Sequence, residues 1–412
     1  MENLLVAQSG GPTSVINATL AGVVQTSMAS SMIDRTLGAV NAIEGIHGEN
    51  FVDFDETIKN VMDIELLAHT PSSALGTCRI KIQGEDECKR LIEIFKKHEI
   101  AYFVYIGGND SMDTVYQLSE YCRKHDIEGI TVVGAPKTID NDLMGTDHCP
   151  GFASAAKYIA TTLQEIERDV RAYTMPSVMI VEIMGRDAGW LTASSVLARG
   201  NGSRGPQLIY PCEIPFSTDD FIKDVKTAVD TYNAVIVAVS EGIRDSEGRY
   251  ISESVQSGQT DAFGHSANIS GAGQVLAALV KEKLGVKVRS VELSLLQRCA
   301  SHIASKVDVS ESRGLGMCAV LNALAGKTGM MSAIFRKSKE GYSTEFGAVP
   351  TSEVVNRVKS LPREYINSAG NNVTEECYNY LKPLIYGEET GFFNGGLPVH
   401  ITDLAKGYEP LL

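Results

Sequence analysis

The chain has 412 residues and a formal net charge of −14, from 37 basic and 51 acidic side chains. This acidic balance, without any block of Lys or Arg, argues against a nucleic-acid-binding surface, so we expect no nucleic-acid partner. A phosphorylated small substrate is still possible, because local cations matter more than the total charge. The length suits about two or three domains, each with its own core.

The eight cysteines form no CxxC pair. This pattern is typical of reduced thiols in the cytosol rather than of a zinc site or a disulfide scaffold. The chain begins with Met1 and enters an apolar strand directly, with neither a basic segment nor a long apolar one before it. We therefore expect a cytoplasmic protein that does not associate with a membrane.

The first expected unit is a strand, a glycine turn and a helix. Residues 4–7 are apolar, Gly10 and Gly11 follow, and Ile16 begins a series of apolar residues at helical spacing. In this layout, backbone N–H groups and the N-terminus of the helix can bind phosphate. Glycine turns are common wherever a strand meets a helix, so this unit alone is a weak indication.

Two later strands end in loops that are rich in glycine and polar side chains. Residues 103–106 lead into a GGNDS loop at 107–111, and residues 130–134 lead into a PKTIDND loop at 136–142. In an open α/β sheet, ligands bind beyond the carboxyl ends of the strands. A cation there can bind phosphate, and a carboxylate can accept a proton or hold a metal-bound water. One such loop is usually only a polar turn, but two in succession indicate a site.

The next part of the chain continues the alternation of strands and helices. A strand at 178–183 ends in an MGR motif at 184–186, and a strand at 235–239 ends in an SEG motif at 240–242. Alternation of this kind over roughly 300 residues predicts a doubly wound α/β architecture. Helical patterns dominate residues 352–386, so we expect a mostly helical C-terminal extension.

Two partial nucleotide-binding motifs fail on inspection. Gly326-Lys327-Thr328 resembles the end of a Walker loop, but Leu321 stands where the earlier glycine is required. Gly271 and Gly273 do not complete a dinucleotide fingerprint, which argues against a nicotinamide oxidoreductase. The strand-end loops instead combine glycines, carboxylates and cations, a set that suits phosphoryl transfer without a Walker loop or protein-kinase motifs.

The chain contains, in this order, the motifs SGG (9–11), LGTCR (75–79), GGNDS (107–111), PKTIDND (136–142), MGR (184–186), SEG (240–242) and QR (297–298). This ordered set, spread over residues 5–326, resembles the phosphofructokinase family. The resemblance implies two similar Rossmann-like α/β domains, with a sugar phosphate in the cleft and the phosphoryl donor along the first domain. The implied units are a donor-binding domain of residues 1–142 and 297–348, a sugar-binding domain of residues 143–296, and a C-terminal extension of residues 349–412.

The resemblance also implies roles for single residues. Asp140 is expected to be the general base that takes the proton from the sugar 1-hydroxyl, and Asp142 to hydrogen-bond the sugar beside it. Lys137 and Arg186 are expected to act in catalysis with Asp140, while Thr138 contacts the sugar and the transferred phosphoryl group. The expected donor ligands are Gly10, Gly11, Arg79, Gly108, Asp110 and Thr138.

On the sugar side, the resemblance implies contacts from Met184, Gly185 and Arg186, and from the Glu241 carboxylate. Arg289 and Arg298 are expected to bind the sugar 6-phosphate. The expected sugar ligands also include Thr138, Asp140 and Asp142. Arg289 is expected to reach this phosphate from a neighbouring subunit. We therefore expect a homodimer or a homotetramer.

Two positions favour pyrophosphate as the donor. ATP-using members have Gly at the positions of Asp110 and Lys137, whereas pyrophosphate-using members have Asp and Lys. The Asp110 carboxylate would take the place of a nucleotide α-phosphate, and Lys137 adds a cation beside the transferred group. The expected reaction is reversible transfer from pyrophosphate to the 1-hydroxyl of fructose 6-phosphate, giving fructose 1,6-bisphosphate and phosphate. The alternatives are an ATP-dependent 6-phosphofructokinase and a catalytically weak sugar-phosphate-binding homologue, against which the intact Asp140 argues.

Three further departures from the family pattern concern the metal and the sugar. Asn109 stands where the family usually has an Asp linked to Mg²⁺. We expect Asn109 and Asp110 to lie nearest to this ion, because a neutral amide can still hold a metal-bound water. Leu295 and Ser177 stand where ATP-using bacterial members have a sugar-site His and a second cross-subunit Arg, which leaves sugar recognition open.

Overall fold

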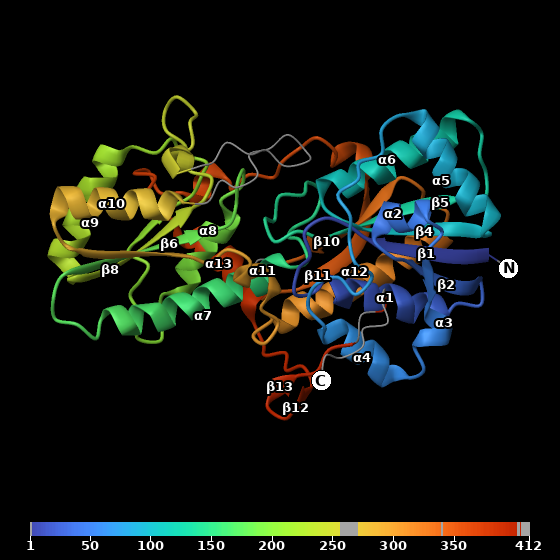
Figure 1. The fold of residues 1–412 in the computed structure, drawn as a ribbon, viewed down its shortest axis with the longest axis horizontal. Coiled ribbons are helices and arrows are strands. Elements are labelled where there is room, and N and C mark those ends of the chain that lie inside the picture. The colour runs from blue at the N-terminus through green and yellow to red at the C-terminus, as the bar shows by residue number, and fades with distance from the viewer. Residues whose placement is uncertain (1, 256–270, 339–340, 402–403, 405–412) are drawn as a thin grey trace.

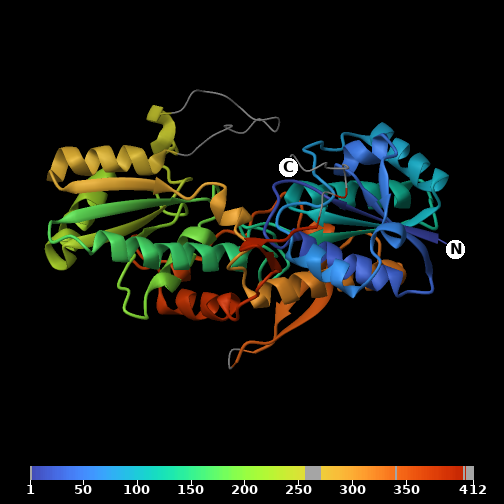
Figure 2. The same cartoon turned by 60° about the horizontal axis from the view of Figure 1, so that its bottom comes forward.

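The computed structural model describes residues 2–255, 271–338, 341–401 and 404. Two large sheets lie at opposite ends of the long axis of the molecule, and helices cover both faces of each (Figures 1 and 2). The predicted α/β class with two Rossmann-like units is therefore confirmed.

The larger sheet has seven strands. In sheet order they are β11 (Thr344–Pro350), β10 (Met330–Arg336), β5 (Thr131–Pro136), β4 (Ile100–Gly107), β1 (Glu2–Gln8), β2 (Ile33–Ala39) and β3 (Phe51–Asp53). The inner strands run parallel, and the edge strands β11 and β3 are antiparallel to their neighbours. Every residue of β4 is buried, as expected for a parallel strand that is covered on both faces.

The smaller sheet has four parallel strands. In sheet order they are β7 (Leu208–Tyr210), β8 (Ala234–Ser240), β6 (Ser177–Ile183) and β9 (Lys287–Glu292). The inner strand β6 is fully buried, whereas the edge strand β9 is only partly covered along its length. One side of β9 therefore has no strand partner among the described residues.

The helices cover the two sheets in separate groups. Around the larger sheet lie α1 (Ile16–Met28), α2 (Ala42–His47), α3 (Phe54–Thr57), α4 (Val61–His69), α5 (Glu85–Lys97), α6 (Asn109–Lys124) and α12 (Lys306–Leu324). Around the smaller sheet lie α7 (Phe152–Val170), α8 (Trp190–Ser194), η1 (Ser195–Ala198), α9 (Thr218–Tyr232), η2 (Ile251–Val255), α10 (Ala272–Leu284) and α11 (Leu296–Cys299). Apolar residues of α1, α4 and α12 fill one core of the larger sheet, and those of α5 and α6 fill another.

This winding determines where a ligand can bind. Strands β1, β4 and β5 are neighbours in the sheet and run in the same direction, so their carboxyl ends meet at one edge. The helices α1 and α6 that follow β1 and β4 contribute to cores on different faces of the sheet. A crevice is expected where consecutive connections leave a sheet on opposite faces.

The C-terminal extension is helical but only in short pieces. It contains η3 (Thr351–Glu353), η4 (Arg363–Tyr365), α13 (Glu375–Leu381) and η5 (Lys382–Ile385), followed by a hairpin of β12 (Phe393–Asn394) and β13 (Leu397–Pro398). Pro350 and Pro362 stand just before η3 and η4, and Pro383 lies at the start of η5. A residue without a backbone donor can begin a helix but cannot continue one from the preceding turn, so the helical pieces stay short. Although the chain enters this segment from the larger sheet, α13 lies on the side of the smaller sheet (Figure 2).

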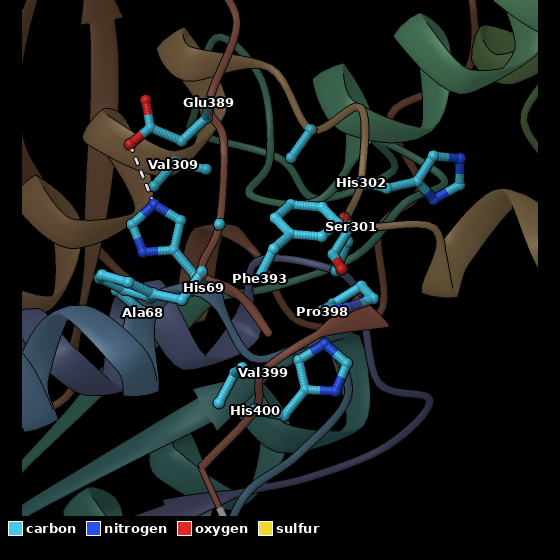
Figure 3. Close-up of a pocket in the computed structure, with 14 residues that line it drawn as sticks. Ala68, His69, Ser301, His302, Val309, Glu389, Phe393, Pro398, Val399 and His400 are labelled. Atoms are coloured by element: carbon cyan, nitrogen blue, oxygen red, sulfur yellow. Dashed lines mark hydrogen bonds and ion pairs between the residues drawn. The ribbon is translucent and has the colours of Figure 1, made fainter. Parts of the chain in front are cut away.

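The terminal hairpin returns to the larger sheet and packs beside α4. Figure 3 shows His69, Phe393 and Pro398 around one cavity. His69 Nε2 lies 3.0 Å from a Glu389 carboxylate oxygen, and the His69 ring packs edge-on against Phe392 with 5.7 Å between ring centroids. The cavity between them measures only about 20 Å³, which is room for about one water molecule. In the described part of the chain, no group of three or more His, Cys, Asp or Glu side chains could hold a metal ion. We therefore interpret the contact between the hairpin and α4 as packing and not as a ligand site.

All eight cysteines are free, as the sequence predicts. In the described ranges, no helix is long and apolar enough to cross a membrane.

Candidate active site

A cavity of about 380 Å³ lies at the carboxyl ends of β1, β4 and β5, opposite the ends of β6 and β8. Of the site residues expected from the sequence, the following line it: Gly10, Gly11, Arg79, Gly108, Asn109, Asp110, Lys137, Thr138, Asp140, Asp142, Met184, Arg186 and Glu241. The fold thus brings most of the strand-end motifs together at one place, and Gly185, Arg289 and Arg298 do not line this cavity.

Lys137 is a buried cation at the end of β5. The residue is only 4% exposed, and its Nζ donates a hydrogen bond of 2.6 Å to the carbonyl of Gly11. Burial lowers the pKa of Lys137 to about 8, an effect that Asp140 opposes and Arg298 increases. A Cβ atom at Gly10, where φ is +77°, would lie 3.3 Å from this Nζ, so glycine suits both the backbone and the approach of the lysine.

Arg298 adds a second cation to the same turn. It lies in α11, and a Cβ atom at Gly11 would come within 2.8 Å of its Nη1. Burial lowers the pKa of Arg298, and the neighbouring charge of Arg79 lowers it further. The cations of Arg79, Lys137 and Arg298 therefore surround the Gly10–Gly11 turn, which is an arrangement suited to phosphate. From the sequence, Arg298 is expected to bind the sugar 6-phosphate. In the structure its guanidinium lies against Gly11, which is an expected ligand of the donor.

Three partly buried carboxylates, Asp140, Asp142 and Glu241, line the same cavity. Burial raises the pKa of Asp140 to about 7, with further increases from Asp142 and Glu241 that Lys137 and Arg186 oppose. Burial also raises the pKa of Asp142 and of Glu241. A carboxylate that titrates near neutral pH can both accept and release a proton, which a general base requires.

The loop that carries Asp140 is shaped by local hydrogen bonds. The backbone N–H of Asp140 donates to Thr138 Oγ1 at 3.1 Å. Asn141 has a positive φ of 56°, and its buried Oδ1 accepts from the backbone N–H of Cys149 at 2.9 Å. Asn141 therefore anchors the loop from inside, while Asp140 and Asp142 on either side of it line the cavity.

Asn109 has an unusual hydrogen-bonding state. It is the first residue of α6, and its Nδ2 donates to Asp142 Oδ2 at 3.2 Å. Its Oδ1 is buried without a hydrogen-bond partner. Buried polar atoms normally have partners, and an amide oxygen beside carboxylates is the type of ligand that Mg²⁺ prefers. The residues present therefore fit a Mg²⁺ ion, which Asn109 Oδ1 and a neighbouring carboxylate would hold.

Asp110 is more exposed than its neighbours. Its side chain is 51% exposed, and its Oδ1 pairs with Lys81 Nζ at 2.6 Å. Asp110 lines the cavity together with Arg79 and Ile80, and Lys81 is the next residue along the chain. The sequence did not single out Lys81, although it lies only two residues after the LGTCR motif.

The sugar side of the cavity is built from the ends of β6 and β8. The Gly185 N–H donates to Glu241 Oε1 at 3.3 Å, and Ser240 Oγ donates to the Gly185 carbonyl at 2.6 Å. The Met184 N–H donates to the buried Gln297 side chain at 3.3 Å. These contacts tie the MGR, SEG and QR motifs together and hold the backbone of the MGR motif in place.

The remaining sugar-site residues lie elsewhere. Arg289 is exposed on the edge strand β9, and Leu295 is 56% exposed just before α11. Ser177 begins β6 and therefore lies at the end of the sheet away from the cavity. Within this chain, Arg289 and Ser177 cannot contact a ligand in the cavity.

Sequence reasoning missed several residues of the cavity wall. Ser9 and Ser111 line it and share a hydrogen bond of 2.8 Å between their Oγ atoms, and both belong to motifs that were recognised. Asp187 and Ala188 directly follow the MGR motif. Val358 comes from the C-terminal extension, and no motif marks it.

Comparisons with known proteins agree on one family. The family model described as Phosphofructokinase matches residues 3–322. The chain is 41% identical to the pyrophosphate–fructose 6-phosphate 1-phosphotransferase of Methylococcus capsulatus over 410 residues, which is 97% of this chain and 95% of that protein. It is also similar to the crystal structure of a pyrophosphate-dependent phosphofructokinase from Marinobacter aquaeolei, with a TM-score of 0.86, 38% identity and coverage of 98% and 96% of the two chains. A second such structure, from Nitrosospira multiformis, gives a TM-score of 0.88 at 37% identity, with coverage of 97% and 96%.

Proposed function

The chain belongs to the phosphofructokinase family, and we propose that it transfers a phosphoryl group from pyrophosphate to the 1-hydroxyl of fructose 6-phosphate. The products are fructose 1,6-bisphosphate and phosphate, and the reaction is reversible. The observation that carries this proposal is the buried Lys137 cation against the Gly10–Gly11 turn. The names of the near-full-length relatives support it.

Asp140 is the general base in this proposal. It accepts the proton of the sugar 1-hydroxyl while that oxygen attacks the phosphorus atom of the donor. Its pKa of about 7 supports this role, because the carboxylate is available at neutral pH and still basic enough to take a proton. In the reverse direction, the protonated Asp140 returns the proton to the leaving sugar oxygen.

The cations stabilise the charge of the transferred phosphoryl group. Lys137 already donates one hydrogen bond to the turn and has further N–H donors that can bind a phosphate oxygen. Arg79 and Arg298 flank the same turn and can hold the phosphate that leaves. Fixed donors of this kind are effective because they need no reorganisation during the reaction.

We propose that Mg²⁺ is required, with Asn109 Oδ1 and the Asp110 carboxylate nearest to the ion. When bound, Mg²⁺ would neutralise charge on the pyrophosphate oxygens. Asn109 also donates to Asp142, so the same side chain fixes the orientation of that carboxylate.

The preference for pyrophosphate over ATP rests on Asp110. Its carboxylate stands at the mouth of the donor cavity and is paired with Lys81. A nucleotide would have to bring its α-phosphate past this carboxylate, and like charges repel. Pyrophosphate has no α-phosphate to bring past Asp110, so this repulsion would not act on it.

Phosphorus NMR tests the proposed reaction directly. With fructose 6-phosphate and Mg²⁺, we expect one pyrophosphate to disappear for each fructose 1,6-bisphosphate formed, with one phosphate released. Adding phosphate and fructose 1,6-bisphosphate should regenerate pyrophosphate. Consumption of ATP but not of pyrophosphate would identify an ATP-dependent 6-phosphofructokinase, and consumption of neither would support a sugar-phosphate-binding homologue.

A further inference from the structure

The C-terminal extension reaches the cavity through one short stretch of chain. Residues 358–361, which we call the strap, run between the loop after β5 and the loop before α8. Val358 lines the cavity, and Leu361 is 3% exposed in the core of the smaller sheet. The strap therefore lies between the two halves of the molecule and touches both.

Lys359 binds the loop that carries the general base. Its backbone N–H donates to the carbonyl of Asp142 at 2.8 Å. Its Nζ donates to the carbonyls of Asp147 at 2.8 Å and Thr146 at 3.0 Å, and to Asn141 Oδ1 at 3.4 Å. One residue of the extension thus satisfies acceptors along the whole stretch 141–147.

The other side of the strap is attached to the smaller sheet. The indole N–H of Trp190 donates to the Lys359 carbonyl at 2.8 Å, and the ammonium lies 5.4 Å from the centre of the indole ring. The Leu361 N–H donates to Glu213 Oε1 at 2.8 Å, and the same oxygen accepts from the Gly189 N–H at 2.7 Å. Gly189 directly follows Ala188, which lines the cavity.

The loop after β5 has no regular secondary structure to hold it. Between β5 and α7, its shape depends on contacts such as those of Asn141 and Lys359. Without the Lys359 ammonium, the Thr146 carbonyl would lose its side-chain donor, whereas the Asp147 carbonyl would keep the Tyr380 hydroxyl at 2.7 Å. Buried acceptors without partners are costly. The loop would then be free to shift, and misplacement of a catalytic group by about 1 Å can cost about a hundredfold in rate.

From this geometry we propose that Lys359 is a positioning residue of the reaction, and that the strap fixes the general-base loop against the sugar-binding side. This inference rests on the proposed function, because it assumes that Asp140 acts as the base. Lys359 itself touches neither reacting atom. It acts through the backbone of residues 141–147 and through Trp190.

Substitution of Lys359 tests the proposal. Lys359→Met keeps most of the aliphatic stem but removes the charge and the three side-chain hydrogen bonds. We expect kcat to fall about 10- to 100-fold, with KM for fructose 6-phosphate and for pyrophosphate changed less than about threefold. Lys359→Arg should recover most of the rate, because its guanidinium can donate to the same carbonyls.

Lys382→Met is the matched control. Lys382 lies in the same extension, and its ammonium is 5.6 Å from the centre of the Tyr378 ring, but it is exposed and has no contact with residues 141–147. We expect its kcat and KM to equal those of the unaltered protein. Trp190 is the only tryptophan of the chain, so its emission reports whether each variant is folded around the strap.

A folded Lys359→Met protein with kcat within twofold of the unaltered protein would overturn the proposal, even if its melting temperature fell. If Lys359→Met does not fold, Trp190→Phe decides, since it removes the donor to the Lys359 carbonyl and keeps an aromatic ring in the core. Because this variant has no tryptophan, circular dichroism reports whether it is folded. We expect it to lower kcat about threefold to tenfold at unchanged KM, and an unchanged kcat would overturn the proposal. Should the unaltered protein and Lys382→Met both use ATP and not pyrophosphate, the proposed donor is wrong, and the same comparison is made with ATP.

Discussion

The two halves of the cavity are assembled in different ways. The donor half comes from the ends of β1, β4 and β5, which are neighbours in one sheet, and each strand leads directly into its functional loop. The acceptor half combines the ends of β6 and β8 with α11 and with Val358 of the C-terminal extension. The donor half is therefore built mainly on one sheet, with Arg79 and Arg298 added from other segments. The acceptor half depends more on segments that are distant in the sequence.

The difference extends to electrostatics. In the donor half, three cations converge on one glycine turn, and Lys137 is almost fully buried. In the acceptor half, Arg289 lies exposed on the edge strand β9, outside the cavity. The donor half therefore contains its cations within one chain, whereas Arg289, expected from the sequence on the sugar phosphate, lies outside the cavity. The substitutions below test the general base between the two halves, then the residues of each half, and then the buried cluster around His148.

Replacing the base at the boundary should have the largest effect. We expect Asp140→Ser to lower kcat about 10²- to 10⁴-fold, the usual contribution of general-base catalysis. KM for fructose 6-phosphate should change much less, because the proton transfer belongs to the transition state. Steady-state kinetics measure this, with the exposed Asp169→Ser on α7 as a control that should be unaffected. Near-normal turnover in a folded Asp140→Ser protein would remove Asp140 from this role.

The donor half should respond to changes in its two distinguishing residues. We expect Lys137→Gly to lower kcat/KM for pyrophosphate about 10²- to 10³-fold, because a fixed cation beside the transferred group is lost. Asp110→Gly should gain activity with ATP, since it removes a carboxylate that repels the nucleotide. The double variant should lose pyrophosphate activity and keep the gain with ATP. Loss of pyrophosphate activity in Asp110→Gly without any gain with ATP would contradict the role given to this carboxylate.

The acceptor half can be tested by mixing subunits. We expect Arg289→Ala to raise KM for fructose 6-phosphate about tenfold, because a charge-assisted hydrogen bond to phosphate is lost. Mixing inactive Asp140→Ser subunits with Arg289→Ala subunits should restore intact sites, at about a quarter of the total in randomly mixed dimers. Full activity in a dilute preparation shown to be monomeric would exclude a site shared between subunits.

The smallest effect on activity is expected from the packing behind the catalytic loop. His148 is 1% exposed, with its Nδ1 2.8 Å from Asp147 and its Nε2 2.7 Å from Glu311. Burial opposes a charge on His148, but the two carboxylates outweigh this and raise its pKa to about 9. Arg336 on Asp147 and Tyr342 on Glu311 complete the cluster.

Because the folded-state pKa of His148 is raised, its stabilising effect is complete below its ordinary pKa of about 6.5 and is lost as the pH rises through about 9. The free energy of unfolding should therefore fall between pH 7 and pH 9.5 by an amount on the order of a few kcal/mol. The melting temperature should fall with it. His148→Gln should be less stable at pH 6.5 and show a flatter dependence, whereas the more exposed His98→Gln should keep the dependence of the unaltered protein. Equal slopes in all three proteins would show that another group titrates.

The sequence predicted the buried strands of both halves but not the edge strand β9, for a physical reason. A parallel strand buried on both faces is a short apolar run, and its end marks the site, so the runs before the GGNDS and PKTIDND loops were found where β4 and β5 lie. Strand β9, with the sequence KVRSVE, lies at an edge and carries charges, so it has no such signal. The roles of the single residues remain predictions.

The contact between the C-terminal extension and the loop that carries Asp140 could not be predicted from the sequence. Lys359 contacts residues 141–147 across more than 200 positions of the chain, and no periodic pattern links the two segments. The side-chain position of Arg298 was likewise unpredictable, because the QR motif does not tell which half of the cavity the guanidinium approaches. Both depend on how α11 and the extension pack between the two sheets.

The central claim is that the donor half selects pyrophosphate, and one measurement tests it most directly. It is the ratio of kcat/KM for pyrophosphate to kcat/KM for ATP, determined on the unaltered protein with saturating fructose 6-phosphate and Mg²⁺. We expect pyrophosphate to be preferred by at least about a hundredfold, the effect of one well-placed charged group in a catalytic site. A ratio below one would contradict the roles given to Asp110 and Lys137.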